Sequence, residues 1–189
     1  MGAVAASASS AAARSALSAG RLHAAVVHGT PGARYPVPES PNIVRIRLAS
    51  WQVGLAAPID APQDWWREAL AGIVPVVQRE PGAGVQQAFL DAGETEHEIP
   101  GPIVGSHLAA ARLSLSTGFA AVTIEPAALA VGARFHPLEV HEAQLWIAGD
   151  WFHDRVVTEA LAVIGDRRFT ERLAGIGGYD LSQSGSRAA

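Results

Sequence analysis

The sequence VPVVQREPGAGVQQAFLDAG, residues 74–93, decides how the rest of the chain is interpreted. Its opening valines favour a buried strand, and the segment 81–84, Pro-Gly-Ala-Gly, cannot continue that strand. Apolar residues then recur with helical spacing, at Val85, Ala88, Phe89 and Ala92. The stretch therefore predicts a strand, a glycine loop and a helix, whose first N–H groups can receive an anion or a carbonyl group. A plain tight turn fits the same pattern.

The composition indicates a globular protein with a large core. Of the 189 residues, 49% are hydrophobic and 17% are charged, which allows one ample domain or two small lobes. The formal charge is -4, and the chain has no Lys and 14 scattered Arg, so we expect no nucleic-acid surface. Cysteine is absent, which excludes disulfides, thiolate nucleophiles and cysteine zinc sites.

The first 20 residues are rich in Ala and Ser but do not form a signal peptide pattern. A basic n-region is missing, and Arg14 interrupts the apolar run. No run reaches the roughly 18 consecutive apolar residues that a membrane-spanning helix needs. We therefore predict a mature cytoplasmic protein.

Short strands alternate with helices along most of the chain, which predicts an α/β architecture with largely parallel sheets. Strands are expected at 22–28, at 43–57 as one or two strands, and at 74–77, 119–124, 135–140 and 144–148. Helices are expected at 9–20, 62–71, 85–92, 106–118, 126–131, 152–164 and 168–176. The tail, residues 182–189, is expected to be loose.

Five stretches of the chain stand in a distinctive order, namely residues 18–29, 48–55, 79–84, 106–111 and 169–184. Together they resemble one family, the substrate-binding-like domains related to periplasmic molybdate-binding proteins. In bacteria these domains often follow a helix-turn-helix module or a molybdopterin-biosynthesis domain. The resemblance implies a type II periplasmic-binding-protein fold, in which two α/β lobes hold a ligand between them.

On this resemblance we assign residues 1–56 to part of the first lobe, 57–140 to the second lobe, and 141–189 to the return into the first lobe with the C-terminal helices. Two departures from the family pattern stand out. Against the family pattern we expect a first lobe that is shortened at its N-terminus, since only eight residues precede Ser9, with the true N-terminus upstream or a partner domain lost or encoded separately. The family's glycine loop tends to read Gly-Ser-Gly-Thr-Arg, whereas residues 82–86 read Gly-Ala-Gly-Val-Gln, so the hydroxyls and the basic side chain are missing.

The resemblance implies ligand contacts in both lobes. Ser9 and Ser10 match the position where relatives present a hydroxyl and an amide to an oxyanion, although N-capping of a helix explains them equally well. The loop Gly82, Ala83 and Gly84 would supply the amides of the second lobe, with Arg79 as a counter-charge.

Four further residues are candidates for lining the ligand site. Ser106 and His107 begin the helix that would face the cleft, and capping alone also explains Ser106. Thr123 ends the following strand. Trp51 lies near the predicted crossing segments, where it would line the cleft or fill the core.

Metal and catalytic sites have little support in the sequence. His136 and His141 are five residues apart on a predicted strand, which places their rings on opposite faces. His97 lies among acidic residues in a loop that we expect to be solvated. A nucleophile elbow of the Gly-x-Ser-x-Gly type is absent, as are P-loop and dinucleotide fingerprints.

These observations predict a non-enzymatic ligand-binding sensor domain for a small anion or polar metabolite, with a molybdate-like oxyanion as the inherited ligand. No cofactor is expected. The resemblance implies a role in transcription regulation or molybdenum-cofactor supply through an upstream DNA-binding domain or partner chain, and homo-oligomers remain open. The alternative is an interaction or structural module that kept the fold while its ligand site decayed.

Overall fold

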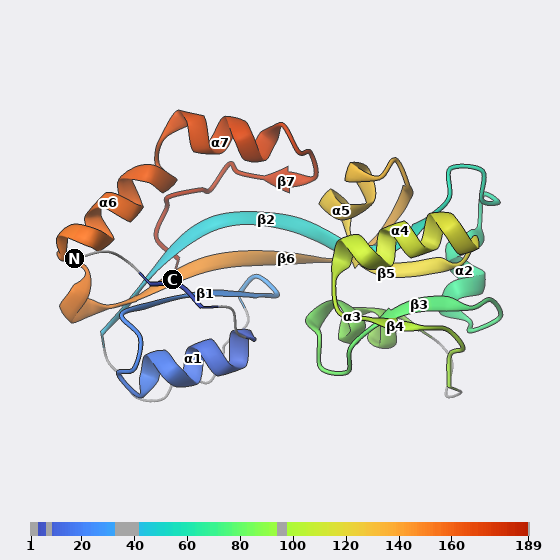
Figure 1. Cartoon of the computed structure of the whole chain (residues 1–189), viewed down its shortest axis with the longest axis horizontal. Helices are drawn as coiled ribbons and strands as arrows, with labels where there is room; N and C mark the ends of the chain where they lie inside the picture. Colours follow the sequence, from blue (N-terminus) through green and yellow to red (C-terminus); the bar gives the residue numbers. More distant parts are fainter. Residues whose placement is uncertain (1–3, 7–8, 33–41, 94–97, 189) are drawn as a thin grey trace. The chain divides into compact units, whose positions relative to one another are not determined.

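The computed structural model describes residues 4–6, 9–32, 42–93 and 98–188. The chain divides into two compact units. Unit 1 takes its residues from 1–50, 141–175 and 180–189, and unit 2 takes residues 51–140 and 176–179. Strands β2 (Ile43–Ala57) and β6 (Arg134–Ala148) each contribute to both units (Figure 1).

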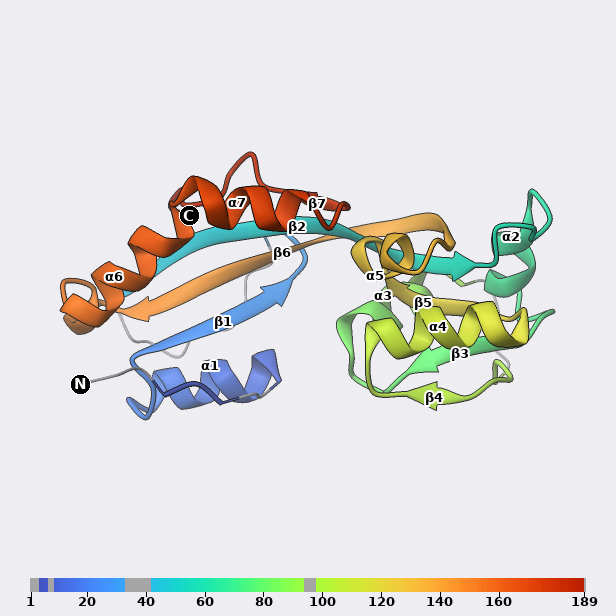
Figure 2. The same cartoon turned by 45° about the horizontal axis from the view of Figure 1, so that its top comes forward.

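Unit 1 is built around an antiparallel pair of strands. β1 (Ala24–Gly29) pairs with the second half of β6. Helix α1 (Ser10–Ser18) lies alongside β1 (Figure 2). One cluster of buried residues in this unit consists of Ala13, Leu17, Ala25, Val27 and Trp146. The apolar face of α1 therefore packs against β1.

Two short helices follow β6 in unit 1. A 3-10 turn, η1 (Gly149–Trp151), precedes α6 (Arg155–Ile164) and α7 (Arg167–Ala174). Asp154 accepts a hydrogen bond from the Val156 N–H at 2.8 Å, and Asp166 accepts one from the Arg168 N–H at 2.7 Å. These caps set the helix starts. The predicted helix start at residue 152 is wrong for this reason.

The C-terminal tail is paired with β2, so the prediction of a loose tail is wrong. The Gly185 N–H donates to the Arg47 carbonyl at 2.9 Å, and the Arg47 N–H donates to the Ser186 carbonyl at 2.9 Å. Ala188 donates in the same way to Arg45 at 3.0 Å. A short strand just before the tail, β7 (Tyr179–Asp180), also pairs with β2. The tail thus satisfies backbone groups along an edge of β2.

Unit 2 alternates strands and helices. Its elements are α2 (Trp65–Leu70), β3 (Val76–Arg79), α3 (Gly84–Ala92), β4 (Ile103–Val104), α4 (His107–Thr117), β5 (Ala120–Ile124) and α5 (Glu125–Ala130). β3 runs parallel to both β4 and β5. Leu55, Val76, Phe89 and Val122 are fully buried in the core of this unit. The strand, glycine loop and helix predicted for residues 74–93 are confirmed as β3 and α3.

The sheet is mixed, which corrects the prediction of largely parallel strands. Hydrogen-bonded neighbours follow the order β1-β6-β2-β5-β3-β4. β1 with β6 and β2 with β5 are antiparallel. The two strands predicted at 135–140 and 144–148 form the single strand β6. The segment between them, with His141 buried, stays extended because it continues the ladder to β1.

Gly54 lies within β2, which runs as one strand through this position. A Cβ atom placed there would lie 2.1 Å from the His136 carbonyl oxygen on β6. Only glycine therefore permits this approach of the two backbones. Among the described residues, no helix is long and apolar enough to cross a membrane.

Candidate functional site

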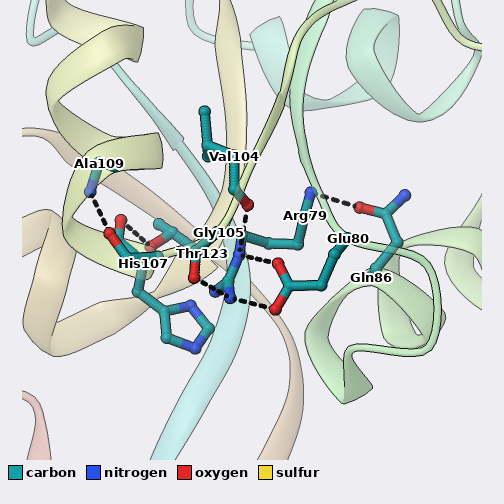
Figure 3. A network of polar contacts seen from close by, with 9 residues as sticks. Arg79, Glu80, Gln86, Val104, Gly105, His107, Ala109 and Thr123 are labelled. Atoms are coloured by element: carbon teal, nitrogen blue, oxygen red, sulfur yellow. Dashed lines mark hydrogen bonds and ion pairs between the residues drawn. The ribbon is translucent and has the colours of Figure 1, made fainter.

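Three parallel strands of unit 2 end at one edge of the sheet. β3, β4 and β5 run in the same direction, and each is followed directly by a helix. The N-termini of α3 and α4 therefore lie at the carboxyl edge of the strands, which is where α/β proteins bind ligands. The side chains gathered at this edge, here called the strand-end site, are those of Arg79, Glu80, His107 and Thr123 (Figure 3), together with Ser106, the N-cap residue of α4.

Arg79 is the cation of the strand-end site, and it is only 6% exposed. Its Nε donates to the Val104 carbonyl at 3.0 Å, and its Nη2 donates to the Gly105 carbonyl at 3.1 Å. Its Nη1 is buried and makes no hydrogen bond with any residue that the structure describes. Arg79 thus ties the end of β3 to the turn between β4 and α4 (Figure 3).

Glu80 pairs with Arg79 through both carboxylate oxygens. Oε2 lies 3.1 Å from the Arg79 Nε, and Oε1 lies 2.9 Å from Nη2. The Glu80 backbone N–H, together with the hydrogen bonds and charge of Arg79 and the charge of His107, lowers the pKa of this carboxyl group. Glu80 is therefore ionised at neutral pH and balances the Arg79 charge. Sequence reasoning missed this residue, although its place beside Arg79 was a signal.

The first turn of α4 is held in place by two hydroxyl groups. Ser106 accepts a hydrogen bond from the Ala109 N–H at 3.1 Å, so the predicted capping role is confirmed. The Thr123 hydroxyl, fully buried, donates to the His107 carbonyl at 2.9 Å. Thr123 therefore fixes α4 against β5. The His107 side chain, on the first residue of α4, is half-buried.

The glycine loop leads from β3 into α3. Gly82 has a left-handed φ of +85°, and Ala83 is the N-cap residue of α3 without a side-chain capping bond. Gln86, on the first turn of α3, is buried and accepts from the Arg79 backbone N–H at 2.9 Å. This second residue missed by sequence reasoning locks α3 to β3. The missing hydroxyl at Ala83 leaves the N-terminus of α3 without a side-chain acceptor.

The other predicted ligand residues have structural partners of their own. Ser9, in unit 1, caps α1 by accepting from the Ala12 N–H at 3.2 Å. The Ser10 hydroxyl lies 2.9 Å from the His28 Nδ1 and accepts from the His28 backbone N–H at 3.2 Å. Burial, and then the Arg14 charge, lowers the pKa of His28, so its ring is neutral at pH 7.

Trp51 belongs to unit 2, where its half-buried ring meets Tyr179 edge-on at 5.9 Å. It also packs against the core of the unit. The core alternative given for Trp51 therefore has direct support, and its role as a lining residue remains a prediction.

The described histidines, aspartates and glutamates form no group of three that could hold a metal ion. The His136 ring stacks on Trp66 with centroids 4.0 Å apart, while the buried His141 lies 6.5 Å from the His28 ring. His97 lies outside the described residues.

The sequence of the chain matches the model of a known family. The family model described as the PBP (periplasmic-binding-protein) superfamily domain matches residues 1–165. The chain belongs to the PBP superfamily. No curated protein has a sequence that matches it.

Solved structures place this PBP domain within the type II α/β fold. A phosphate transport receptor from Vibrio cholerae is 15% identical, with a TM-score of 0.60, and the match covers 90% of this chain and 84% of that one. A putative phosphate substrate-binding protein from Clostridium perfringens, solved with phosphate, is 10% identical with a TM-score of 0.63, over 87% and 82% of the two chains. The regulatory domain of MetR, a LysR family regulator from N. meningitidis, is 12% identical with a TM-score of 0.60, over 88% and 77%. At these identities the likeness shows the fold alone, and the predicted type II fold is confirmed.

Proposed function

We propose that this PBP domain is a non-enzymatic sensor that binds a small anion or polar metabolite at the strand-end site. The observation that supports this most is the combination of a buried Arg79 with the N-termini of two helices at one sheet edge. Helix N-termini and a guanidinium group both favour anionic groups. The similar solved structures are binding proteins and regulatory domains.

The ligand contacts would come from backbone amides more than from side chains. The amides of Gly82 and Gly84 lie at the start of α3, while Ser106 and His107 lie at the start of α4. The Ala83 N–H, also predicted as a ligand donor, already donates to the Glu80 carbonyl at 3.1 Å and would have to give up that bond. Ser9 and Ser10 of unit 1, Thr123 and Trp51 remain proposed contributors. Because Thr123 already donates to a backbone carbonyl, its contribution would be to position α4.

A molybdate-like oxyanion remains one candidate, and phosphate joins it because one similar protein was solved with phosphate bound. Binding would be read out in transcription regulation or molybdenum-cofactor supply, through a DNA-binding domain or partner chain. The resemblance of the fold to a LysR family regulatory domain supports the first readout. Homo-oligomers remain part of the proposal. This role corresponds to a cytoplasmic protein.

Calorimetric titration with molybdate, tungstate, sulfate and phosphate tests the proposal. Heat of binding and a thermal shift with at least one anion are the expected results. Replacing Ala83 with Asp gives α3 a capping carboxylate, worth about 1 kcal/mol of stability, while the same carboxylate repels an anion. Ala83→Asp should therefore melt higher and bind more weakly.

Ser116→Asp is the matched control, because it adds the same charge at the exposed far end of α4. Equal anion affinity in the Ala83→Asp variant and the wild type would refute binding at the start of α3. The absence of heat and thermal shift with all four anions would refute the anion sensor.

One observation favours the alternative of an interaction or structural module. The Arg79 charge is already met by Glu80 and by the carbonyls of Val104 and Gly105, which is the pattern of a structural clamp. A module of this kind would bind none of the anions and would keep its stability in their presence.

A further inference from the structure

We propose that the Glu80 carboxylate is an internal competitor for the anion site. An incoming oxyanion takes over the Arg79 guanidinium, and Glu80 is released to solvent. This inference rests on the proposed function and identifies Glu80 as the residue that sets the selectivity of the strand-end site among anions.

The first argument is the geometry of the ion pair. Glu80 places one oxygen on the Arg79 Nε at 3.1 Å and the other on Nη2 at 2.9 Å. Two parallel N–H···O bonds on one edge of a guanidinium are also how arginine binds the carboxylate or phosphate of a ligand. Glu80 therefore occupies the edge of Arg79 that a ligand anion would use (Figure 3).

The second argument is the unequal burial of the two partners. The Arg79 side chain is 6% exposed and is held by two backbone carbonyls, whereas the Glu80 side chain is 49% exposed. Glu80 can rotate into water, but Arg79 cannot follow it. A buried cation without a counter-ion is strongly unfavourable. Glu80 can therefore leave only when another anion arrives, so binding is an exchange.

The third argument is the helix N-terminus beside the pair. The Arg79 Nη2, which Glu80 contacts, also donates to the Gly105 carbonyl at 3.1 Å, directly before α4, a helix of 11 residues. The Arg79 Nη1 is buried and makes no hydrogen bond with a described residue, so the Arg79 charge is met on the Nε and Nη2 edge. An oxyanion that replaces Glu80 on this edge meets the positive end of the α4 dipole, which favours the exchange.

The exchange predicts a preference among anions. Because Glu80 is attached to the chain, its local concentration at Arg79 is in the millimolar range or above. A singly charged carboxylate such as acetate has the same charge and the same two acceptor oxygens as Glu80, so it should displace Glu80 poorly. A doubly charged anion with more than two acceptor oxygens, such as hydrogen phosphate, has the advantage.

Calorimetric titration of the Glu80→Gln variant with inorganic phosphate, at pH 7.5 and constant ionic strength, tests the exchange. Glutamine keeps the shape and one acceptor oxygen but removes the competing charge. We expect phosphate to bind about tenfold more tightly than to the wild type, since a charge-assisted hydrogen bond is worth about 1.5 kcal/mol or more. Glu68→Gln on α2, exposed and away from Arg79, is the control for net charge and should leave the affinity unchanged.

A second readout uses thermal stability. Without phosphate, Glu80→Gln should have a lower Tm than the Glu68→Gln control, because Arg79 has lost its counter-ion. Adding phosphate should supply a counter-ion and remove this difference in Tm. Glu80→Asp, which keeps the charge on a shorter side chain, should bind phosphate with intermediate affinity.

The outcomes separate the two proposals. If the wild type binds phosphate and Glu80→Gln binds it no more tightly than the Glu68→Gln control, the exchange is overturned and the sensor stands. If Glu80→Gln binds no phosphate at all, the exchange is overturned whatever the wild type does, while the sensor is judged by the wild type against the four anions. If only Glu80→Gln binds, the exchange is supported, with Glu80 as an effective block.

Discussion

Replacing Gly54 with alanine should destabilise unit 2 through a single steric clash. The new Cβ would lie 2.1 Å from the His136 carbonyl oxygen and 3.0 Å from the Phe135 Cζ, both on β6. A carbon and an oxygen need about 3.2 Å, so β2 and β6 must separate locally by about 1 Å. Overpacking of this kind costs about 3 kcal/mol. In a chain of this size that corresponds to a fall in Tm of roughly 6–12 °C.

Differential scanning calorimetry and urea unfolding of the variant measure this effect. The two compact units can melt in separate steps, so the loss is expected in the transition that belongs to unit 2. Gly105→Ala is the matched control, because its Cβ meets nothing within 4 Å and its φ is not left-handed. We expect the control within about 0.5 kcal/mol of the wild type. If Gly54→Ala melted within 1 °C of the wild type, the close approach of β2 and β6 at this glycine would be refuted.

Two further predictions concern a helix cap and a histidine. Ser106→Ala loses the acceptor for the Ala109 N–H, so the free energy of unfolding of unit 2, measured with urea, should fall by about 1 kcal/mol. An unchanged urea midpoint would contradict the capping role. If the variant also bound anions more weakly at a temperature where it is fully folded, Ser106 would be a ligand contact as well. The pKa of His28 is lowered in the folded state, so stability is fully present above the unfolded value of about 6.5 and falls as the pH drops through the folded value. Between pH 7.5 and pH 5, the free energy of unfolding should fall less in His28→Asn than in the wild type. His153→Asn, a change at an exposed histidine, is the control. An equal fall in the wild type and both variants would show that His28 is not responsible.

The sequence alone predicted most elements of unit 2, although not the short strand β4, and it predicted the type II fold. Strand, glycine loop and helix at residues 74–93 depend on apolar spacing and on residues that cannot continue a strand, which are local signals. The hydroxyl caps at Ser9 and Ser106 are local in the same way, since each acts within one helical turn. The order of such signals carried the family resemblance, and the PBP superfamily match agrees with it.

The tertiary structure decided which strands pair and which charges meet. Strand direction, the continuity of β6 and the pairing of the tail with Arg47 depend on partners far along the chain, and no local pattern encodes them. The same holds for Arg79, whose role depends on carbonyls 25 and 26 residues away. The sequence showed a cation beside a glycine loop. The fold buried that cation, supplied it with Glu80, and so changed a presumed ligand contact into a charge that a ligand must compete for.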